Sequence, residues 1–198
     1  VDNVEVASCG ARVALAASQR PVPTAYGRST RISVTASRSG TSGAAPTGAV
    51  RVTFGGHTYA AALAAGSAAL TIPMLDGVGQ LPVTVSYLPS GAFAPATKAL
   101  ALSVVKATPK LNAFIKAGTG RNGKPLVIVV QVTAPGTPVT GRVRLFKGSK
   151  RLGKAILNSN GQVRFKARGL PSRGKLKVTI KYGGSVTVAK STRTLRNR

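Results

Sequence analysis

The feature that most constrains the fold is an internal repeat whose period is close to half of the chain. Three segments recur in the same order and at similar spacing: PTGAVRVTFGG (46–56) as VTGRVRLFKGS (139–149), LPVTVSYLPSG (81–91) as LKVTIKYGGSV (176–186), and, more loosely, YGRSTRISVTA (26–36) as NGKPLVIVVQV (122–132). The Pro-containing stretch at 104–112 falls between the two copies. We therefore expect two modules of one topology, joined by that stretch as a short linker.

Apolar residues alternate with polar ones in both copies, as they do in antiparallel strands that place one face on a core. The expected inward residues of the first copy are Ile32, Val34, Ala36, Val50, Val52, Phe54, Leu70, Ile72, Val83, Val85, Tyr87, Leu100, Leu102 and Val104. Those of the second copy are Ile128, Val130, Val132, Val143, Leu145, Val163, Phe165, Leu176, Val178, Ile180 and Tyr182. With an opening strand at 13–18, the pattern predicts an all-β chain of two sandwiches with about seven strands each.

The Ala-rich run TYAAALAAGSAAL at 58–70 is the segment most easily mistaken for a helix. Gly66 interrupts the run, and no capping box precedes it. Aromatic residues make up only 5% of the chain, and Ala, Val, Gly, Thr and Ser recur, which favours short strands joined by turns. We expect this run to form two short strands.

The sequence resembles the bacterial Ig-like repeat domains that occur in tandem on secreted and surface proteins, especially those of actinobacteria. The resemblance covers nearly the whole chain and is carried in the first copy by ASQRPVPTAYGRSTRISVTAS (17–37), PTGAVRVTF (46–54) and VTVSYLPSGAFAPAT (83–97). The second copy departs more, because KYGGSVTVAKST (181–192) lacks the aromatic residue and Pro of the first copy. Its last strand is expected to be cut short at TLRNR (194–198).

This resemblance implies two tandem immunoglobulin-like antiparallel β-sandwiches on a secreted or cell-surface protein. We expect a leading segment at 1–10, a first domain at 11–107 and a strongly basic second domain at 108–198. The chain begins VDNVEVASCG, without the basic and apolar regions of a signal peptide, so we expect a mature or excised fragment of a longer protein. No apolar run of about 18 residues is available to span a bilayer.

Few residues of the chain can carry chemistry. With a single Cys, Cys9, and a single His, His57, we expect no intramolecular disulfide, no zinc cluster and no Cys–His–Asn arrangement. Cys9 is expected to be either a semi-buried thiol or a site of pairing with another molecule. His57 is expected to be exposed at a hairpin, and Asp76 to serve an Asp-Gly turn. We expect no enzymatic activity, no metal and no cofactor.

Tyr87 and Tyr182 occupy matching places on inward stripes of the two copies. Each is expected to bury its ring and to hydrogen-bond its hydroxyl near the end of a sandwich. The alternative, an aromatic sugar-binding platform, is disfavoured because the chain contains no Trp.

The charge of the chain is very unevenly distributed. The net charge is +26, and residues 1–107 hold 8 basic and 3 acidic residues, whereas residues 108–198 hold 21 basic residues and no acid. The basic residues of the second copy alternate with the apolar stripe and are predicted to point outward on both sheets: Arg142, Arg144, Arg164, Lys166, Arg168, Lys175, Lys177 and Lys181. Outward polar residues are ordinary, but cations without compensating acids repel one another unless an anionic partner offsets the cost.

The favoured hypothesis is a non-catalytic spacer and electrostatic attachment region, whose partner is a cell-wall polymer, an anionic lipid surface or non-specifically bound DNA. Sequence-specific nucleic-acid reading is disfavoured, because no recognition helix or stacking platform accompanies the basic rows. One alternative is an adhesin or assembly module that binds another protein through sheet edges or exposed Val127, Val129 and Phe146. Another is an accessory C-terminal part of a larger secreted enzyme.

Overall fold

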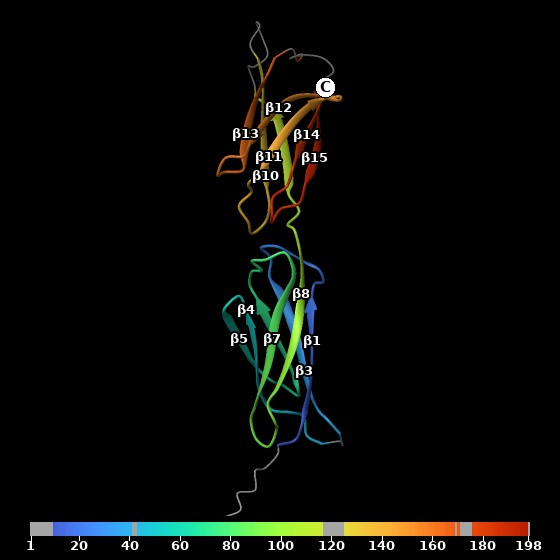
Figure 1. Cartoon of the computed structure of the whole chain (residues 1–198), viewed down its shortest axis with the longest axis vertical. Helices are drawn as coiled ribbons and strands as arrows, with labels where there is room; N and C mark the ends of the chain where they lie inside the picture. Colours follow the sequence, from blue (N-terminus) through green and yellow to red (C-terminus); the bar gives the residue numbers. More distant parts are fainter. Residues whose placement is uncertain (1–9, 41–42, 117–124, 169, 171–175, 198) are drawn as a thin grey trace, which may run out of the picture. The chain divides into compact units, whose positions relative to one another are not determined.

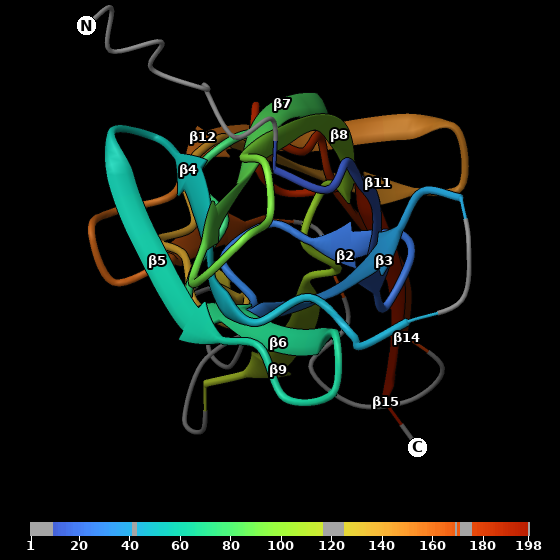
Figure 2. The ribbon, with the colours of Figure 1, turned by 90° about the horizontal axis from the view of Figure 1, so that it is seen from below.

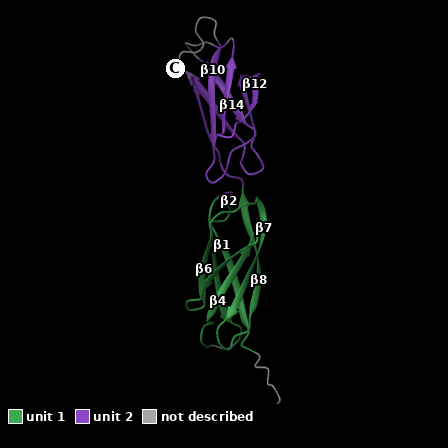
Figure 3. Cartoon of the chain, turned by 90° about the vertical axis from the view of Figure 1, so that its left-hand side faces the viewer, with its two compact units in different colours: residues 1–24, 28–105 green, residues 25–27, 106–198 purple. Residues whose placement is uncertain are grey.

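The computed structural model describes residues 10–40, 43–116, 125–168, 170 and 176–197. The chain divides into two compact units: unit 1 comprises residues 1–24 and 28–105, and unit 2 comprises residues 25–27 and 106–198 (Figure 3). The described residues form strands and loops without a helix (Figure 1). Two residues singled out in the sequence, Cys9 and Lys175, lie outside the described residues.

Unit 1 is a sandwich of two sheets, with strand orders β1-β3-β6 and β2-β8-β7-β4-β5. Its strands are β1 (Val13–Arg20), β2 (Thr24–Ala25), β3 (Thr30–Arg38), β4 (Gly48–Phe54), β5 (His57–Ala62), β6 (Ser67–Ile72), β7 (Gly79–Pro89) and β8 (Ala96–Val105). β5 and β6 belong to different sheets and lie side by side at one edge of the sandwich (Figure 2). The expected inward residues are buried, apart from half-buried Leu100, so the alternation predicted the strand phase correctly.

The Ala-rich run at 58–70 forms strands, as predicted. β5 covers its first residues and β6 its last, and Ala64 and Ser67 exchange backbone hydrogen bonds of 2.8 and 2.9 Å across the turn between them. Ala65 and Gly66 in this turn have φ values of 47° and 73°, whereas a helix needs negative φ at every residue. A Cβ atom on Gly66 would lie 2.7 Å from the carbonyl oxygen of Ala36, so the turn requires glycine.

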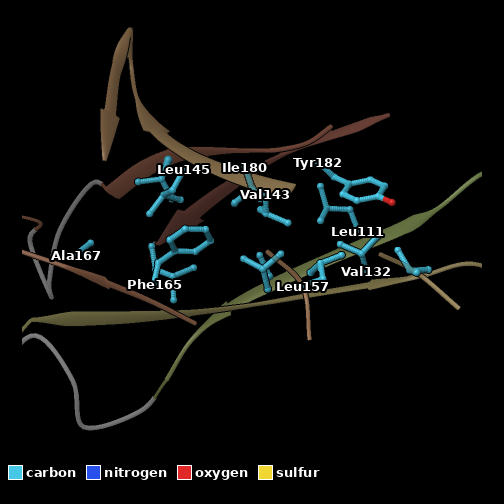
Figure 4. Close-up of a cluster of buried hydrophobic side chains, with 14 of the residues drawn as sticks. Leu111, Val132, Val143, Leu145, Leu157, Phe165, Ala167, Ile180 and Tyr182 are labelled. Carbon is cyan, nitrogen blue, oxygen red and sulfur yellow. The ribbon is translucent and has the colours of Figure 1, made fainter. Parts of the chain in front are cut away.

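Unit 2 is a seven-stranded antiparallel sandwich, with sheet orders β13-β10-β9 and β12-β11-β14-β15. Its strands are β9 (Lys110–Ile115), β10 (Leu126–Thr133), β11 (Arg142–Lys147), β12 (Lys150–Ile156), β13 (Gln162–Ala167), β14 (Leu176–Tyr182) and β15 (Ser191–Asn197). Side chains of the two sheets meet in the core, where Phe165 and Ala167 of β13 lie toward Leu145 of β11 (Figure 4). All expected inward residues are buried except Val163, which is half-buried.

The last strand of unit 2 is shorter than its counterpart in unit 1, as expected: β15 has 7 residues and β8 has 10. β15 begins at Ser191 and pairs with the whole of β14, from Tyr182 opposite Ser191 to Leu176 opposite Asn197. Leu195 is the only large apolar residue of β15. An edge strand can form on backbone hydrogen bonds and one apolar contact when its neighbour is buried.

A matching corner precedes β4 in unit 1 and β11 in unit 2. The rings of Tyr87 and Tyr182 are buried, and each hydroxyl bonds to a backbone carbonyl, as predicted. The residue that follows each accepting carbonyl is a glycine. In unit 2 this is Gly141, whose φ is 117° and whose Cβ position lies 2.7 Å from the Gly184 carbonyl oxygen and 3.2 Å from the Tyr182 ring. The backbone conformation and the packing of the tyrosine therefore require glycine at the second position of the repeated Thr-Gly pair.

Candidate polyanion-binding surface

The outer face of the four-stranded sheet of unit 2 carries cations on its two central strands. Arg142 and Arg144 of β11 and Lys177 and Lys181 of β14 are exposed. The residues that alternate with them are buried: Val143, Leu145, Val178 and Ile180. β11 and β14 pair directly, so the structure brings these four predicted residues onto one face.

Three cations of this face stand directly opposite one another on adjacent strands. Arg144 of β11 pairs with Lys181 of β14 on one side and with Lys154 of β12 on the other. All three side chains are exposed. We call Lys154, Arg144 and Lys181 the cation row. Like charges at directly opposed positions of a sheet destabilise it, so the row is an unfavourable arrangement for the protein alone.

Sequence reasoning missed Lys154, because its place depends on a β-bulge. The pairing of β11 with β12 shifts by one residue between Leu145 and Phe146. A regular hairpin would place Gly153 opposite Arg144 and would turn Lys154 to the other face, whereas the shift places Lys154 opposite Arg144. The glycine in the RLGK segment was the one sequence signal for such a bulge.

Phe146 holds the ammonium group of Lys181 on this outer face. The Lys181 Nζ lies 5.1 Å from the centroid of the Phe146 ring, within the range of a cation–π interaction. Phe146 pairs with Thr179, the outward residue of β14 that precedes Lys181. Phe146 is half-buried. The alternative of a protein-binding module expected this side chain to be exposed.

The outer face of the three-stranded sheet places its cations differently. Arg164 and Lys166 are exposed on β13, and Arg168 is exposed just after it, as predicted. The central strand between β13 and β9 carries valines outward, and Val129 stands between Arg164 on β13 and Phe114 on β9. Val129 is only 6% exposed, so the expectation of an exposed valine here is wrong. The long side chains on both sides of Val129 shield it from water.

One further cation of unit 2 has a structural role. The guanidinium of Arg193 on β15 donates hydrogen bonds of 3.1 Å to the carbonyl oxygen of Leu111 and 3.3 Å to the Asn112 Oδ1 atom on β9. Arg193 thus links the edge strands of the two sheets. Such a side chain is not free to bind a ligand, and we leave it out of the candidate surface.

The equivalent face of unit 1 lacks the cation row. Arg51 of β4 occupies the place of Arg144, and it pairs with Ala60 of β5 and Ser86 of β7. Neither neighbour is charged. The two units therefore differ in charge at the positions of Lys154 and Lys181, which are Ala60 and Ser86 in unit 1. Ala and Ser are thus suitable replacements for these two lysines in mutational tests.

The described residues offer little for metal or acid–base chemistry. Among them, no group of three His, Cys, Asp or Glu residues is placed to hold a metal ion. His57 begins β5 and is exposed, as expected, and Asp76 is exposed between β6 and β7. In the part of the chain that the structure describes, no helix is long and apolar enough to cross a membrane.

Residues 115–197 match the model of a family described as bacterial Ig-like domain (group 3). Unit 2 is similar to the bacterial Ig-like domains. The Ig-like match spans β10 to β15 and thus includes the whole cation row. No curated protein matches the chain.

Solved structures resemble the chain in fold. A segment of two fibronectin type III domains from chicken tenascin has a TM-score of 0.51 at 16% identity, covering 93% of this chain and 98% of that one. The N-terminal eight Ig domains of the Down Syndrome Cell Adhesion Molecule have a TM-score of 0.49 at 10% identity, covering 94% of this chain and 24% of that one. A three-Ig fragment of titin has a TM-score of 0.46 at 14% identity, covering 86% of this chain, which spans 59% of the fragment. The tenascin likeness shows the fold alone: two Ig-like β-sandwiches in tandem.

Proposed function

We propose that this chain is a non-catalytic, extracellular pair of Ig-like modules that attaches its parent protein to an anionic polymer or surface. Unit 1 supplies length, and unit 2 supplies the charge that binds. The similarity of unit 2 to bacterial Ig-like domains supports the extracellular setting and the scaffolding role.

One observation carries the proposal: cations accumulate on unit 2 at positions where they repel one another. Residues 108–198 include 21 basic residues and no acid, so no Asp or Glu of this unit can pair with any of them. The cation row adds direct opposition of like charges. A polyanion would replace this repulsion with attraction and would release its own counterions.

The alternative of a protein-binding module rests on sheet edges or on exposed Val127, Val129 and Phe146. Val129 is buried, and the other two are half-buried. The surface offered by these three residues is therefore small compared with the cationic faces.

The test is to measure binding of the whole chain to long-chain inorganic polyphosphate, phosphatidylglycerol vesicles and duplex DNA over a series of salt concentrations. Neutral dextran and vesicles of neutral lipid are the controls. We expect affinity for at least one anionic probe to fall steeply with salt, with a slope set by the number of ionic contacts. Affinity that does not change with salt, or equal binding to the neutral controls, would overturn the proposal.

A further inference from the structure

We infer that the anion site of unit 2 is the outer face of the β12-β11-β14-β15 sheet, centred on the cation row, and that it takes a linear polymer of repeated oxyanions. This inference rests on the proposed function and narrows it to one of two cationic faces. It also selects a flexible chain over a flat anionic surface.

The cation row of this face is uninterrupted across three adjacent strands. Neighbouring strands are about 4.8 Å apart, so the backbones that carry the cation row span about 10 Å across three strands. Arg142 lies two residues before Arg144 on β11, and Lys177 stands opposite Arg196 at the far end of β14. Thr179 lies between Lys177 and Lys181 and faces Thr194 across the strand pair. The face thus offers a strip of cations interspersed with hydroxyl donors, which suits consecutive oxyanions.

The other cationic face lacks this continuity. Its cations on β13 are separated from β9 by the central strand β10, which presents Val127 opposite Lys166 and Val129 opposite Arg164. Phe114 of β9, opposite Val129, is 55% exposed. A polyanion lying across these strands would cover apolar side chains between its charged contacts. The four-stranded sheet also exposes an apolar residue, Ile156, opposite Arg142. No apolar residue interrupts its cation row, however, and this favours the four-stranded sheet.

Phe146 prepares the cation row for a ligand. Its ring holds the Lys181 ammonium 5.1 Å from the centroid, which reduces the freedom of a long side chain before binding. Arg144, whose backbone is directly opposite that of Lys181, is exposed on the same face. Both exposed cations are thus available for contact with anionic groups of a ligand.

The twist of the sheet favours a linear partner. Adjacent strands rotate by roughly 20–25° relative to each other, so a four-stranded sheet presents a curved face. A flat bilayer can touch only part of that face, whereas a flexible polymer can follow the cation row from Lys154 to Lys181. The oxyanion chemistry is shared by phosphate polymers and acidic glycans, so both chemistries enter the experiment as separate probes.

The experiment compares two variants of the whole chain that lose three positive charges each. The row variant removes two members of the cation row, by Lys154→Ala and Lys181→Ser, and the neighbouring cation of β11, by Arg142→Ala. The first two substitutions introduce the residues that pair with Arg51 in unit 1. The β13 variant carries Arg164→Ala, Lys166→Thr and Arg168→Ala. Thermal unfolding confirms that both are folded. Each is titrated with long-chain polyphosphate, poly-glutamate, heparin and phosphatidylglycerol vesicles over a salt series.

We expect the row variant to lose at least tenfold in polyphosphate affinity, and its plot of log affinity against log salt to be shallower by about 2. The β13 variant should lose less than threefold. Tighter binding to polyphosphate than to heparin and poly-glutamate would assign the site to phosphate polymers. Tighter binding to heparin than to polyphosphate and poly-glutamate would assign it to acidic glycans.

Three outcomes would overturn the inference, and one of them would overturn the proposed function as well. Equal loss in both variants would show that net charge acts without a defined face. Tighter binding to vesicles than to every soluble polymer, lost in the row variant, would replace the linear partner with a membrane. If the unaltered chain binds no anionic probe in a salt-dependent way, the proposed function itself fails.

Discussion

The hydroxyl of Tyr182 donates a 2.6 Å hydrogen bond to the backbone carbonyl of Thr140, and Tyr87 donates an equally short bond to the carbonyl of Thr47 in unit 1. Each bond ties a central strand to the chain 40 or 42 residues earlier. In both units, therefore, the same tyrosine hydrogen bond positions the backbone at the start of β4 and β11.

Tyr182→Phe is expected to lower the free energy of unfolding by about 1 kcal/mol, because it removes one hydrogen bond and leaves the buried ring in place. Chemical denaturation followed by circular dichroism measures the change. Tyr87→Phe is the matched control in unit 1 and should cost a similar amount. A Tyr182→Phe variant as stable as the unaltered chain would show that this bond contributes nothing net.

Stability in alkali should also depend on this side chain. Burial raises the pKa of Tyr182 above its ordinary value of 10.0, and a hydrogen bond with the Ser185 hydroxyl opposes part of that rise. The folded protein then holds the phenol proton more tightly than the unfolded chain does. The stabilisation is fully present below pH 10 and is lost as the pH rises through the folded-state pKa. The difference in unfolding free energy between the unaltered chain and Tyr182→Phe should therefore shrink above that pH, and a difference that stays constant would contradict this.

Lys154→Ala is expected to stabilise the unliganded protein at low salt by a few tenths of a kcal/mol, because it removes one of two like-charge contacts of Arg144. The gain should disappear at high salt, where the repulsion is screened. Calorimetric melting at two salt concentrations measures both effects. Lys98→Ala removes an exposed charge from unit 1, and a gain as large as that of Lys154→Ala would mean that net charge, and not the cation row, sets the cost.

Two neighbouring substitutions on β14 test the strand phase. Val178 is fully buried, so Val178→Asp should destabilise unit 2 by more than about 4 kcal/mol, since it buries an unpaired carboxylate. Thr179→Asp adds the same charge one residue later, on the outer face between Lys177 and Lys181. It should leave the protein folded. NMR spectra of the whole chain distinguish the two outcomes, and a well-dispersed spectrum from Val178→Asp would show that the phase is wrong.

Much of the fold could be predicted because the side chains of every β-strand alternate between its two faces with a period of two residues. Side chains alternate across a pleated strand, so Val143 and Leu145 fixed the outward direction of Arg142 and Arg144 before any pairing was known. The immunoglobulin-like topology then placed β11 beside β14, which brought Lys181 to the same face. These inferences needed only local pattern and strand order.

The rest depended on interactions that alternation does not record. Lys154 joins the cation row because a bulge shifts its strand by one residue, and a bulge is decided by packing across the sheet. Val129 follows the outward phase but is buried, because the neighbouring strands place Arg164 and Phe114 on either side of it. Burial on an outer face is set by lateral neighbours that come from distant parts of the sequence.

The pairing of β15 with β14 has a consequence for biosynthesis. Unit 1 holds all of its strands by residue 105, so it can close its sandwich while the remainder of the chain is still being made or exported. Unit 2 cannot complete its sandwich until residues 191–197 are present, because they pair with the free edge of β14. Arg193 in this segment then links that edge to β9. Until then β14 exposes an unpaired backbone between cations, whose mutual repulsion keeps emerging chains from pairing with one another.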